Sequence, residues 1–278
     1  MTTTGEQENP DRGTGRAFKS LDINLIKKSL ICTNLISDVY YIDETDSTNT
    51  LARKININNV LIITEYQTNG RGRFGRSWLS DKAKNLLFTI KQTYPLEPIK
   101  LHYLNFYYSY LVYKTIRDFI TENNADASLL KLKWPNDVLY GNKKISGILI
   151  ETTQPKNIVY TGIGININQE FDDATNFISL MQIPGIKGEV DRTGFLIRLL
   201  NNFCNNLHLL ESGNLYTLYH LWKKATDLIG KEVLIYHHSS KYRTKVIDLL
   251  QDGGIKLNIG ENERIFYSSD ITISLIQK

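Results

Sequence analysis

A segment rich in glycine and arginine, at residues 70–78, joins two short apolar runs at 60–64 and 85–90. It places three glycines and three arginines before a tryptophan, and because the flanking runs can be buried, we expect it to be a connecting loop. Glycine lets the backbone approach a ligand closely, and arginine offers a planar set of donors suited to phosphate and carboxylate oxygens. The sequence therefore predicts a flexible cationic lid for a small anionic metabolite.

Two other structures would carry the same residues. Arginine and glycine also cluster in disordered RNA-binding tails, but such tails are repeated and flanked by low-complexity sequence, which this loop is not. A solvated surface turn is the second alternative, because charged loops usually are solvated. The motifs that follow make the surface turn less favoured than a ligand-binding lid.

Length, charge and cysteine content limit the classes of protein to consider. The 278 residues fit one large domain and one small one, and a net charge of +4 is too small for a protein that coats DNA. No apolar run approaches the ~18 residues needed to span a bilayer, so no membrane association is expected. Cys32 and Cys204 are far apart and belong to no Cys-x-x-Cys pair, which suggests neither a disulfide framework nor a zinc site. No bound metal is predicted, and a reducing cytoplasm is the expected location.

The chain divides into three parts. Residues 1–18 have little to bury and are expected to form an extension outside the fold, and residues 19–227 are expected to form the main domain. There, periodicity and composition predict helices at 21–30, 50–55, 101–119, 192–210 and 214–225, and strands at 39–42, 131–133, 137–140, 143–152 and 157–167. The tyrosines of the long helix at 101–119 are expected to pack in the core or between subunits.

The character of the chain changes from Gly230 onward. Short segments of strand character lie at 231–236, 241–249, 254–259, 263–267 and 271–275, separated by turns rich in Gly, Asp, Asn and Ser. They predict a small closed β-barrel over residues 228–278.

A second motif, at residues 133–137, places a lysine, a tryptophan, a proline, an asparagine and an aspartate at the entrance of a predicted strand. The asparagine can bind an amide or a ring edge, and the aspartate can approach a phosphate-bound Mg²⁺. The motif indicates a nucleotide-binding corner, although a packed Trp-Pro turn would look the same.

Two further motifs lie on the predicted strands at 143–152 and 157–167. Lys144 precedes Gly147 by three residues, so a cation able to neutralise a carboxylate lies near a glycine that permits close approach. An isolated lysine pair is otherwise usually solvated. Glycines and asparagines at 162–168 could frame an adenine, but the third glycine of a dinucleotide fingerprint is absent, as is a Gly-Lys-Ser/Thr phosphate loop. A Rossmann dehydrogenase and a P-loop ATPase are both disfavoured.

Taken together and in this order, the motifs resemble those of the biotin–protein ligases over about residues 38–276. Phe74 stands at a loop position that is often basic in that family. The matching segments are 46–49, 65–67 leading into 70–78, 133–137, Lys144 with Gly147 and Glu151, and 162–166. The resemblance implies an α+β fold: a mixed β-sheet flanked by helices, of the class II synthetase-like biotin/lipoate ligase type, with a small C-terminal SH3-like β-barrel.

The resemblance also implies a two-step reaction that uses ATP with Mg²⁺. Biotin's carboxylate attacks the α-phosphate to give biotinyl-5′-adenylate and pyrophosphate, and a lysine of a biotin carboxyl carrier protein domain of a carboxylase then takes the biotinyl group. Such a reaction needs no enzyme nucleophile, and the chain shows no Ser-His-Asp or Cys-His arrangement. Catalysis would depend on positioning two anions and neutralising charge through Arg71, Arg73 and Lys144.

Site residues are carried over from the resemblance position by position. Biotin is expected against Ser47, Thr48, Asn49, Gln67, Gly70, Arg71, Gly72, Arg73, Lys144 and Gly147. ATP is expected against Arg73, Arg76, Trp78, Lys133, Asn136, Asp137 and Asn166, with Trp78 stacking on adenine. The lid would also keep water from the mixed anhydride.

Three alternatives stay open at this point. Lipoate ligases and octanoyltransferases share the core fold, although the cationic loop combined with the motif at 133–137 favours biotin. Some relatives are biotin-sensing repressors with a winged helix, but residues 1–37 are too few for that domain, so no DNA binding is expected. A biotin-binding protein without activity is the third alternative, and the motifs do not distinguish a monomer from a homodimer.

Overall fold

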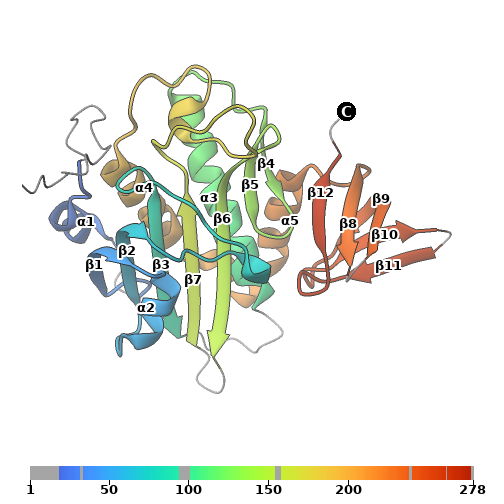
Figure 1. Ribbon diagram of the computed structural model, residues 1–278. Helices are drawn as coiled ribbons and strands as arrows, with labels where there is room; N and C mark the ends of the chain where they lie inside the picture. Colours follow the sequence, from blue (N-terminus) through green and yellow to red (C-terminus); the bar gives the residue numbers. More distant parts are fainter. Residues whose placement is uncertain are drawn as a thin grey trace, which may run out of the picture.

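The computed structural model describes residues 19–31, 34–93, 101–153, 158–237, 240–260 and 262–276 (Figure 1). The extension expected at 1–18 lies outside these residues. Within them, no helix combines the length and the apolar character that crossing a membrane requires.

A seven-stranded mixed sheet forms the main body, in the order β1-β2-β3-β7-β6-β5-β4. Its first two strands pair in parallel, and every other neighbouring pair is antiparallel. The strands are β1 (Asp38–Thr45), β2 (Val60–Gln67), β3 (Leu86–Thr93), β4 (Leu130–Lys133), β5 (Asp137–Tyr140), β6 (Lys143–Thr153) and β7 (Ile158–Ile165). The predicted mixed sheet is confirmed.

Helices cover both faces of this sheet because its strands are apolar on both sides. Leu61 and Ile63 of β2 point into the large core, whereas Val60 and Ile62 point to a smaller cluster with Ala52. On the large-core face lie α3 (His102–Glu122), α4 (Arg192–Asn205) and α5 (Leu215–Thr226), with α1 (Ile23–Ser29) packed on α4, and on the opposite face lies α2 (Thr48–Lys54) (Figure 1).

The long helix α3 carries its tyrosines into the core, as expected. Tyr107 and Tyr108 are fully buried, and the Tyr107 hydroxyl donates a hydrogen bond to the carbonyl of Phe203 on α4. The α4 helix itself is shorter than predicted: it ends at Asn205, and residues 207–210 form a separate 3₁₀ turn. The Asn206 side chain bonds back to the carbonyl of Asn202, which satisfies the helix end there.

A second, five-stranded antiparallel sheet follows, in the order β11-β10-β9-β8-β12. Its strands are β8 (Glu232–His237), β9 (Ser240–Leu249), β10 (Ile255–Ile259), β11 (Asn262–Phe266) and β12 (Thr272–Leu275). A small C-terminal β unit is thus confirmed, whereas its closure into a barrel and the boundary at residue 228 stay predictions.

The two sheets share one apolar core. Trp222 of α5 stacks on Phe106 at 4.2 Å between ring centroids, the Tyr219 hydroxyl donates to Leu249 at 2.6 Å, and the Trp134 indole donates to Gly253 at 3.0 Å. The tryptophan of the predicted nucleotide corner is therefore anchored on the C-terminal unit.

Sequence spacing gave a wrong expectation for one cysteine. Cys204 of α4 is disulfide-bonded, although no disulfide was expected. Separation along the chain says nothing about separation in space, and α1 packs on α4 from a distant part of the chain. Cys32 lies outside the described residues.

Candidate active site

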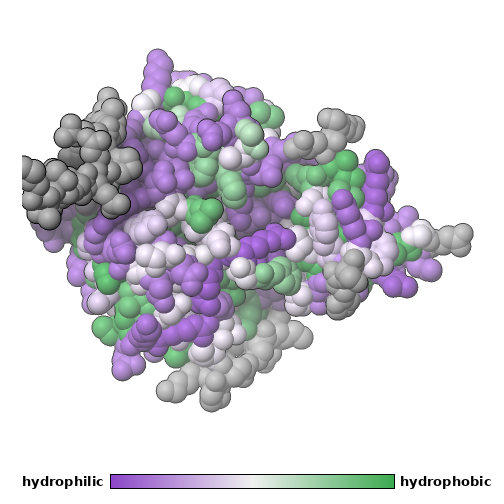
Figure 2. All heavy atoms as spheres, viewed as in Figure 1, coloured by the Kyte–Doolittle hydropathy of each residue, from purple (hydrophilic) through white to green (hydrophobic). Residues whose placement is uncertain are grey.

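A cavity of about 750 Å³ opens on the face of the main sheet that carries α2, next to the C-terminal sheet. Every residue predicted for biotin or ATP lines it, except Gly70. Gly70 lies at its edge, where its carbonyl accepts the Trp78 N–H at 2.8 Å. In the space-filling view, hydrophilic residues gather in the middle of this face (Figure 2).

The cationic segment is a hairpin that crosses the sheet toward the C-terminal unit (Figure 1). The Gly72 N–H donates to the Arg76 carbonyl at 2.6 Å, and a 3₁₀ turn at Arg73–Gly75 closes the tip. At the tip, Phe74 has a left-handed φ of 55° and is 57% exposed. The loop can thus cover the cavity while its tip stays in solvent.

Glycines form the floor of the cavity, so the strands themselves are accessible. Gly147 of β6 pairs with Gly164 of β7, and Gly162 follows on the same face. A Cβ added at Gly164 would lie 2.5 Å from the Trp78 ring, and one at Gly162 would lie 2.5 Å from Asn49 Oδ1. The indole of Trp78 thus lies against bare backbone, and its buried Nε1 has no hydrogen-bond partner among the described residues. That donor is available to a ligand.

One end of the cavity is a polar cluster at the start of α2. The Thr48 N–H donates to Gln67 Oε1 at 2.8 Å, and the Thr48 hydroxyl lies 2.8 Å from that of Thr89. Ser47 is the N-cap of α2 and is buried, although no side-chain capping bond forms. This end offers several oriented hydroxyl and amide groups to a polar ring.

The other end gathers cations around one carboxylate. Lys144 Nζ lies 2.7 Å from Asp137 Oδ1 and 5.3 Å from the centroid of the Trp78 ring. Burial lowers the pKa of Lys133, which the nearby Asp137 partly offsets, and burial likewise lowers the pKa of Arg73. Several cations face a single aspartate, so this end favours an anion.

Each loop arginine contacts another element. Arg71 donates to the hydroxyl of Thr50 in α2 at 3.0 Å. Arg73 donates to Asn136 Oδ1 at 3.3 Å and also to the carbonyl of Ser268, and Arg76 lies 3.4 Å from the Thr272 hydroxyl. The loop therefore joins the polar end, the segment at 133–137 and the C-terminal unit.

Two residues predicted to bind ligands, Asn166 and Asn49, form hydrogen bonds within the protein. The Asn166 amide donates to the carbonyls of Lys144 and Ile178, both at 3.2 Å. The Asn49 amide donates to Glu151 at 2.8 Å, and its oxygen accepts from Thr89 at 2.6 Å. Both side chains line the cavity, but their hydrogen bonds fix the surrounding strands and helix.

Sequence reasoning missed several parts of the wall. Strand β12 lines the cavity, as does the segment after β7 that carries Phe171 and Phe177, whose ring centroids are 5.7 Å apart. Thr89 supports the wall by donating to Asn49 Oδ1 at 2.6 Å, and it was also missed, although a threonine in the apolar run at 85–90 was a signal. The contributions of β12 and the post-β7 segment arise from tertiary packing and had no local signal.

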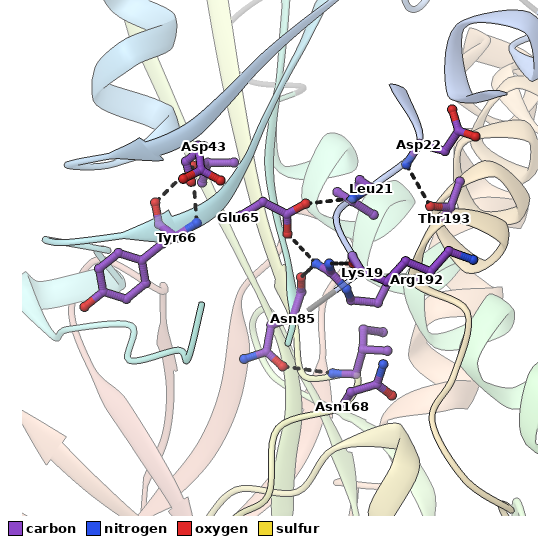
Figure 3. A network of polar contacts seen from close by, with 12 residues as sticks. Lys19, Leu21, Asp22, Asp43, Glu65, Tyr66, Asn85, Asn168, Arg192 and Thr193 are labelled. Carbon is purple, nitrogen blue, oxygen red and sulfur yellow. Dashed lines mark hydrogen bonds and ion pairs between the residues drawn. The ribbon is translucent and has the colours of Figure 1, made fainter. Parts of the chain in front are cut away.

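Behind the loop, a buried ion pair joins its two stems (Figure 3). Arg192 Nη1 donates to Glu65 Oε2 at 2.6 Å and to the carbonyl of Asn85 at 3.1 Å, and Nη2 donates to the carbonyl of Lys19 at 2.7 Å. Glu65 also accepts the Leu21 N–H at 2.7 Å. Glu65 precedes the loop and Asn85 follows it, so Arg192 fixes both ends. Glu65 was matched without a role, and Arg192 was not identified.

Among the described residues, no group of three or more His, Cys, Asp or Glu side chains is placed to hold a metal ion. Mg²⁺ is commonly held by one or two carboxylates together with substrate phosphates. Asp137 in the cation-rich end fits that mode of binding.

Comparison with known proteins agrees with this geometry. The family model described as "Biotin/lipoate A/B protein ligase family" matches residues 41–168. The biotin--[acetyl-CoA-carboxylase] ligase of Paracoccus denitrificans is 32% identical over 200 residues, covering 68% of this chain and 81% of that protein. The bifunctional ligase/repressor BirA of Bacillus subtilis is 27% identical over 247 residues, covering 84% of this chain and 73% of that protein. The structure of the Aquifex aeolicus biotin protein ligase in complex with biotin and ATP matches with a TM-score of 0.71 at 25% identity, covering 87% of this chain and 100% of that one.

Proposed function

Because the chain belongs to the biotin/lipoate A/B protein ligase family, we propose that its central cavity activates biotin with ATP and presents the product to a carrier lysine. The chain is a biotin ligase by its relatives, and the acceptor we propose is a biotin carboxyl carrier protein domain of a carboxylase. One observation supports this proposal most directly: a polar cluster at α2 and a cation cluster at β5 and β6 line the same cavity.

We place the ring of biotin at the polar end. The groups there are Ser47, Thr48 and Gln67, whose side chains are oriented by the bonds around Thr48. The valeryl chain of biotin would cross the glycine floor beside the Trp78 ring, because the glycines add no side chain there. Its carboxylate would then reach the cations.

The first step joins two anions. The carboxylate oxygen attacks the α-phosphorus, the bond from that phosphorus to the bridging oxygen breaks, and pyrophosphate leaves. Lys144, Arg73 and Lys133 would neutralise the charge that repels the reactants, and Arg76 would contact the phosphates. Mg²⁺ would arrive with ATP near Asp137 and supply further charge neutralisation.

The second step needs no group of the enzyme to form a covalent bond. The neutral amine of the acceptor lysine attacks the carbonyl of the adenylate and loses a proton to solvent as the amide bond forms, and AMP leaves with the electron pair of the broken C–O bond. Until then the hairpin at 70–78 would keep water from the mixed anhydride. The loop bonds to the C-terminal sheet would help to keep it closed.

The proposal is tested by the exchange of labelled pyrophosphate into ATP, run with biotin, lipoate or octanoate in the presence of Mg²⁺. Exchange with biotin alone is expected. Exchange with lipoate or octanoate instead of biotin would assign the site to the lipoate ligases and octanoyltransferases. No exchange with any of the three acids would reject adenylation.

The remaining expectations are tested separately. The Bacillus subtilis relative is a bifunctional ligase/repressor, so gel retardation with operator-like DNA tests our expectation of no shifted band. Sedimentation distinguishes a monomer from a homodimer, and a cytoplasmic location stays a prediction.

A further inference from the structure

Glu151 of β6 lies where three elements meet at the polar end of the cavity. Its Oε2 accepts a hydrogen bond from the Asn49 amide at 2.8 Å and lies 3.8 Å from Arg71 Nη2. Its Oε1 lies 3.2 Å from Arg53 Nη2. One carboxylate therefore contacts the first turn of α2, the last turn of α2 and the start of the cationic loop, and none of the roles described above includes it.

The Asn49 side chain is held on three sides. Glu151 accepts its amide, Thr89 donates to its oxygen at 2.6 Å, and Gly162 leaves the space that the oxygen fills. Asn49 is only 3% exposed. Because Thr48 is its neighbour in the same turn, whatever fixes Asn49 also fixes the group that bonds Gln67.

Arg53 and Arg71 approach different oxygens of the same carboxylate. Arg53 is itself held over the Tyr160 ring, 4.8 Å from its centroid, and it pairs with Oε1. Oε2 is left for Asn49 and Arg71, and Arg71 is also bonded to Thr50 of α2. The contact with Arg71 thus adds charge attraction to a hydrogen bond that already brings the loop to α2.

We propose that Glu151 is a positioning residue that couples the ring end of the biotin site to the cationic loop. Its carboxylate fixes Asn49 by a hydrogen bond and draws Arg71 by charge, so that docking of the loop start and ordering of the α2 turn stabilise each other. This inference rests on the proposed function and deepens it, because it links recognition of the biotin ring to closure over its carboxylate.

Two substitutions separate the two roles. Glu151→Gln keeps an oxygen acceptor for Asn49 but removes the charge, whereas Glu151→Ala removes both. Glu122→Gln is the matched control, because Glu122 pairs with Arg198 on the large-core face, away from the cavity. The first readout is the rate at which trypsin cleaves after Arg71 and Arg73 in the protein without biotin or ATP, relative to cleavage elsewhere in the chain.

For Glu151→Gln we expect loop cleavage to rise about two- to fivefold, as for loss of a partly exposed ion pair, with cleavage elsewhere unchanged. The KM for biotin should rise more in Glu151→Ala than in Glu151→Gln, with the KM for ATP unchanged in both. Glu122→Gln should leave loop cleavage and both KM values at wild-type levels.

The proposal is overturned if both Glu151 variants show wild-type loop cleavage, or if cleavage rises equally along the whole chain, as a loss of global stability would cause. A rise in the KM for ATP equal to that for biotin would also reject it. The cleavage readout uses no substrate, so it stands even if wild-type protein shows no pyrophosphate exchange, and the two failures are distinguishable.

Discussion

Replacing Arg192 with methionine is expected to lower the free energy of unfolding by about 3–5 kcal/mol, the usual cost of stripping one partner from a buried ion pair. The side chains of Arg192 and Glu65 are only 5% and 1% exposed, so water cannot replace the lost guanidinium. The Glu65 carboxylate would keep only the Leu21 N–H. Since folded domains are stable by about 5–15 kcal/mol, the loss is a large fraction of the total.

The assay is urea unfolding followed by tryptophan fluorescence, with thermal melting as a second measure. At roughly 2–4 °C for each kcal/mol in a protein of this size, the melting temperature should fall by about 6–20 °C. Arg198→Met is the control, because its pair with Glu122 is exposed and such pairs contribute about 1 kcal/mol or less.

A double variant tests the reasoning more strictly. Glu65→Leu with Arg192→Met removes both charges, so it should be more stable than Arg192→Met alone, since no uncompensated charge remains buried. If Arg192→Met costs no more than Arg198→Met, or if the double variant is the less stable of the two, then the pair does not stabilise the loop stems as argued.

Three further outcomes are expected. Gly164→Ala puts a Cβ 2.5 Å from the Trp78 ring, so an overpacking cost of about 1–3 kcal/mol should lower the melting temperature by about 2–12 °C, and an unchanged melting temperature would argue against the contact between Trp78 and the glycine floor. Burial lowers the pKa of Lys133 below its ordinary 10.5, so between the folded and the unfolded pKa the unfolded chain binds more protons and stability rises with pH. Lys133→Met removes the buried cation, so the variant should melt at a higher temperature than wild type at pH 8, while pyrophosphate exchange should fall about 10²–10³-fold. A lower melting temperature would contradict this. Arg73→Ala should release biotinyl-adenylate into solution in a single turnover, and wild-type retention would count against the lid.

Features encoded locally in the sequence could be predicted. Strands β8–β12 lie within one or two residues of their expected places, because alternation and turn residues are properties of neighbouring positions. The residues of the cavity could be grouped because the motifs that carry them occur in a recognisable order. The end of α4 was placed too late, because the apolar pattern continues into a 3₁₀ turn after Asn206 breaks the helix.

Features that depend on long-range packing could not be predicted. Nothing near Arg192 in the sequence indicates that it bonds Glu65, from which it is separated by 127 positions. The same holds for β12, which lines the cavity although no motif there suggested a ligand. Thr89 and Glu151 differ, because each lies in a segment already noted. Thr89 was not identified and Glu151 was matched without a role, since the partner they share, Asn49, is distant in the sequence.

The bond between Arg73 and the carbonyl of Ser268 spans 195 positions, and that between Arg76 and Thr272 spans 196. A ribosome that adds about 5–20 residues per second needs roughly 10–40 seconds to pass from one partner to the other. During that interval the hairpin at 70–78 of a nascent chain has no C-terminal unit to contact. The Trp134 indole likewise has no Gly253 carbonyl to donate to. The order of synthesis thus delays assembly of the site until the second sheet has emerged, so a chain interrupted before that point would bear the motifs without the enclosure they form.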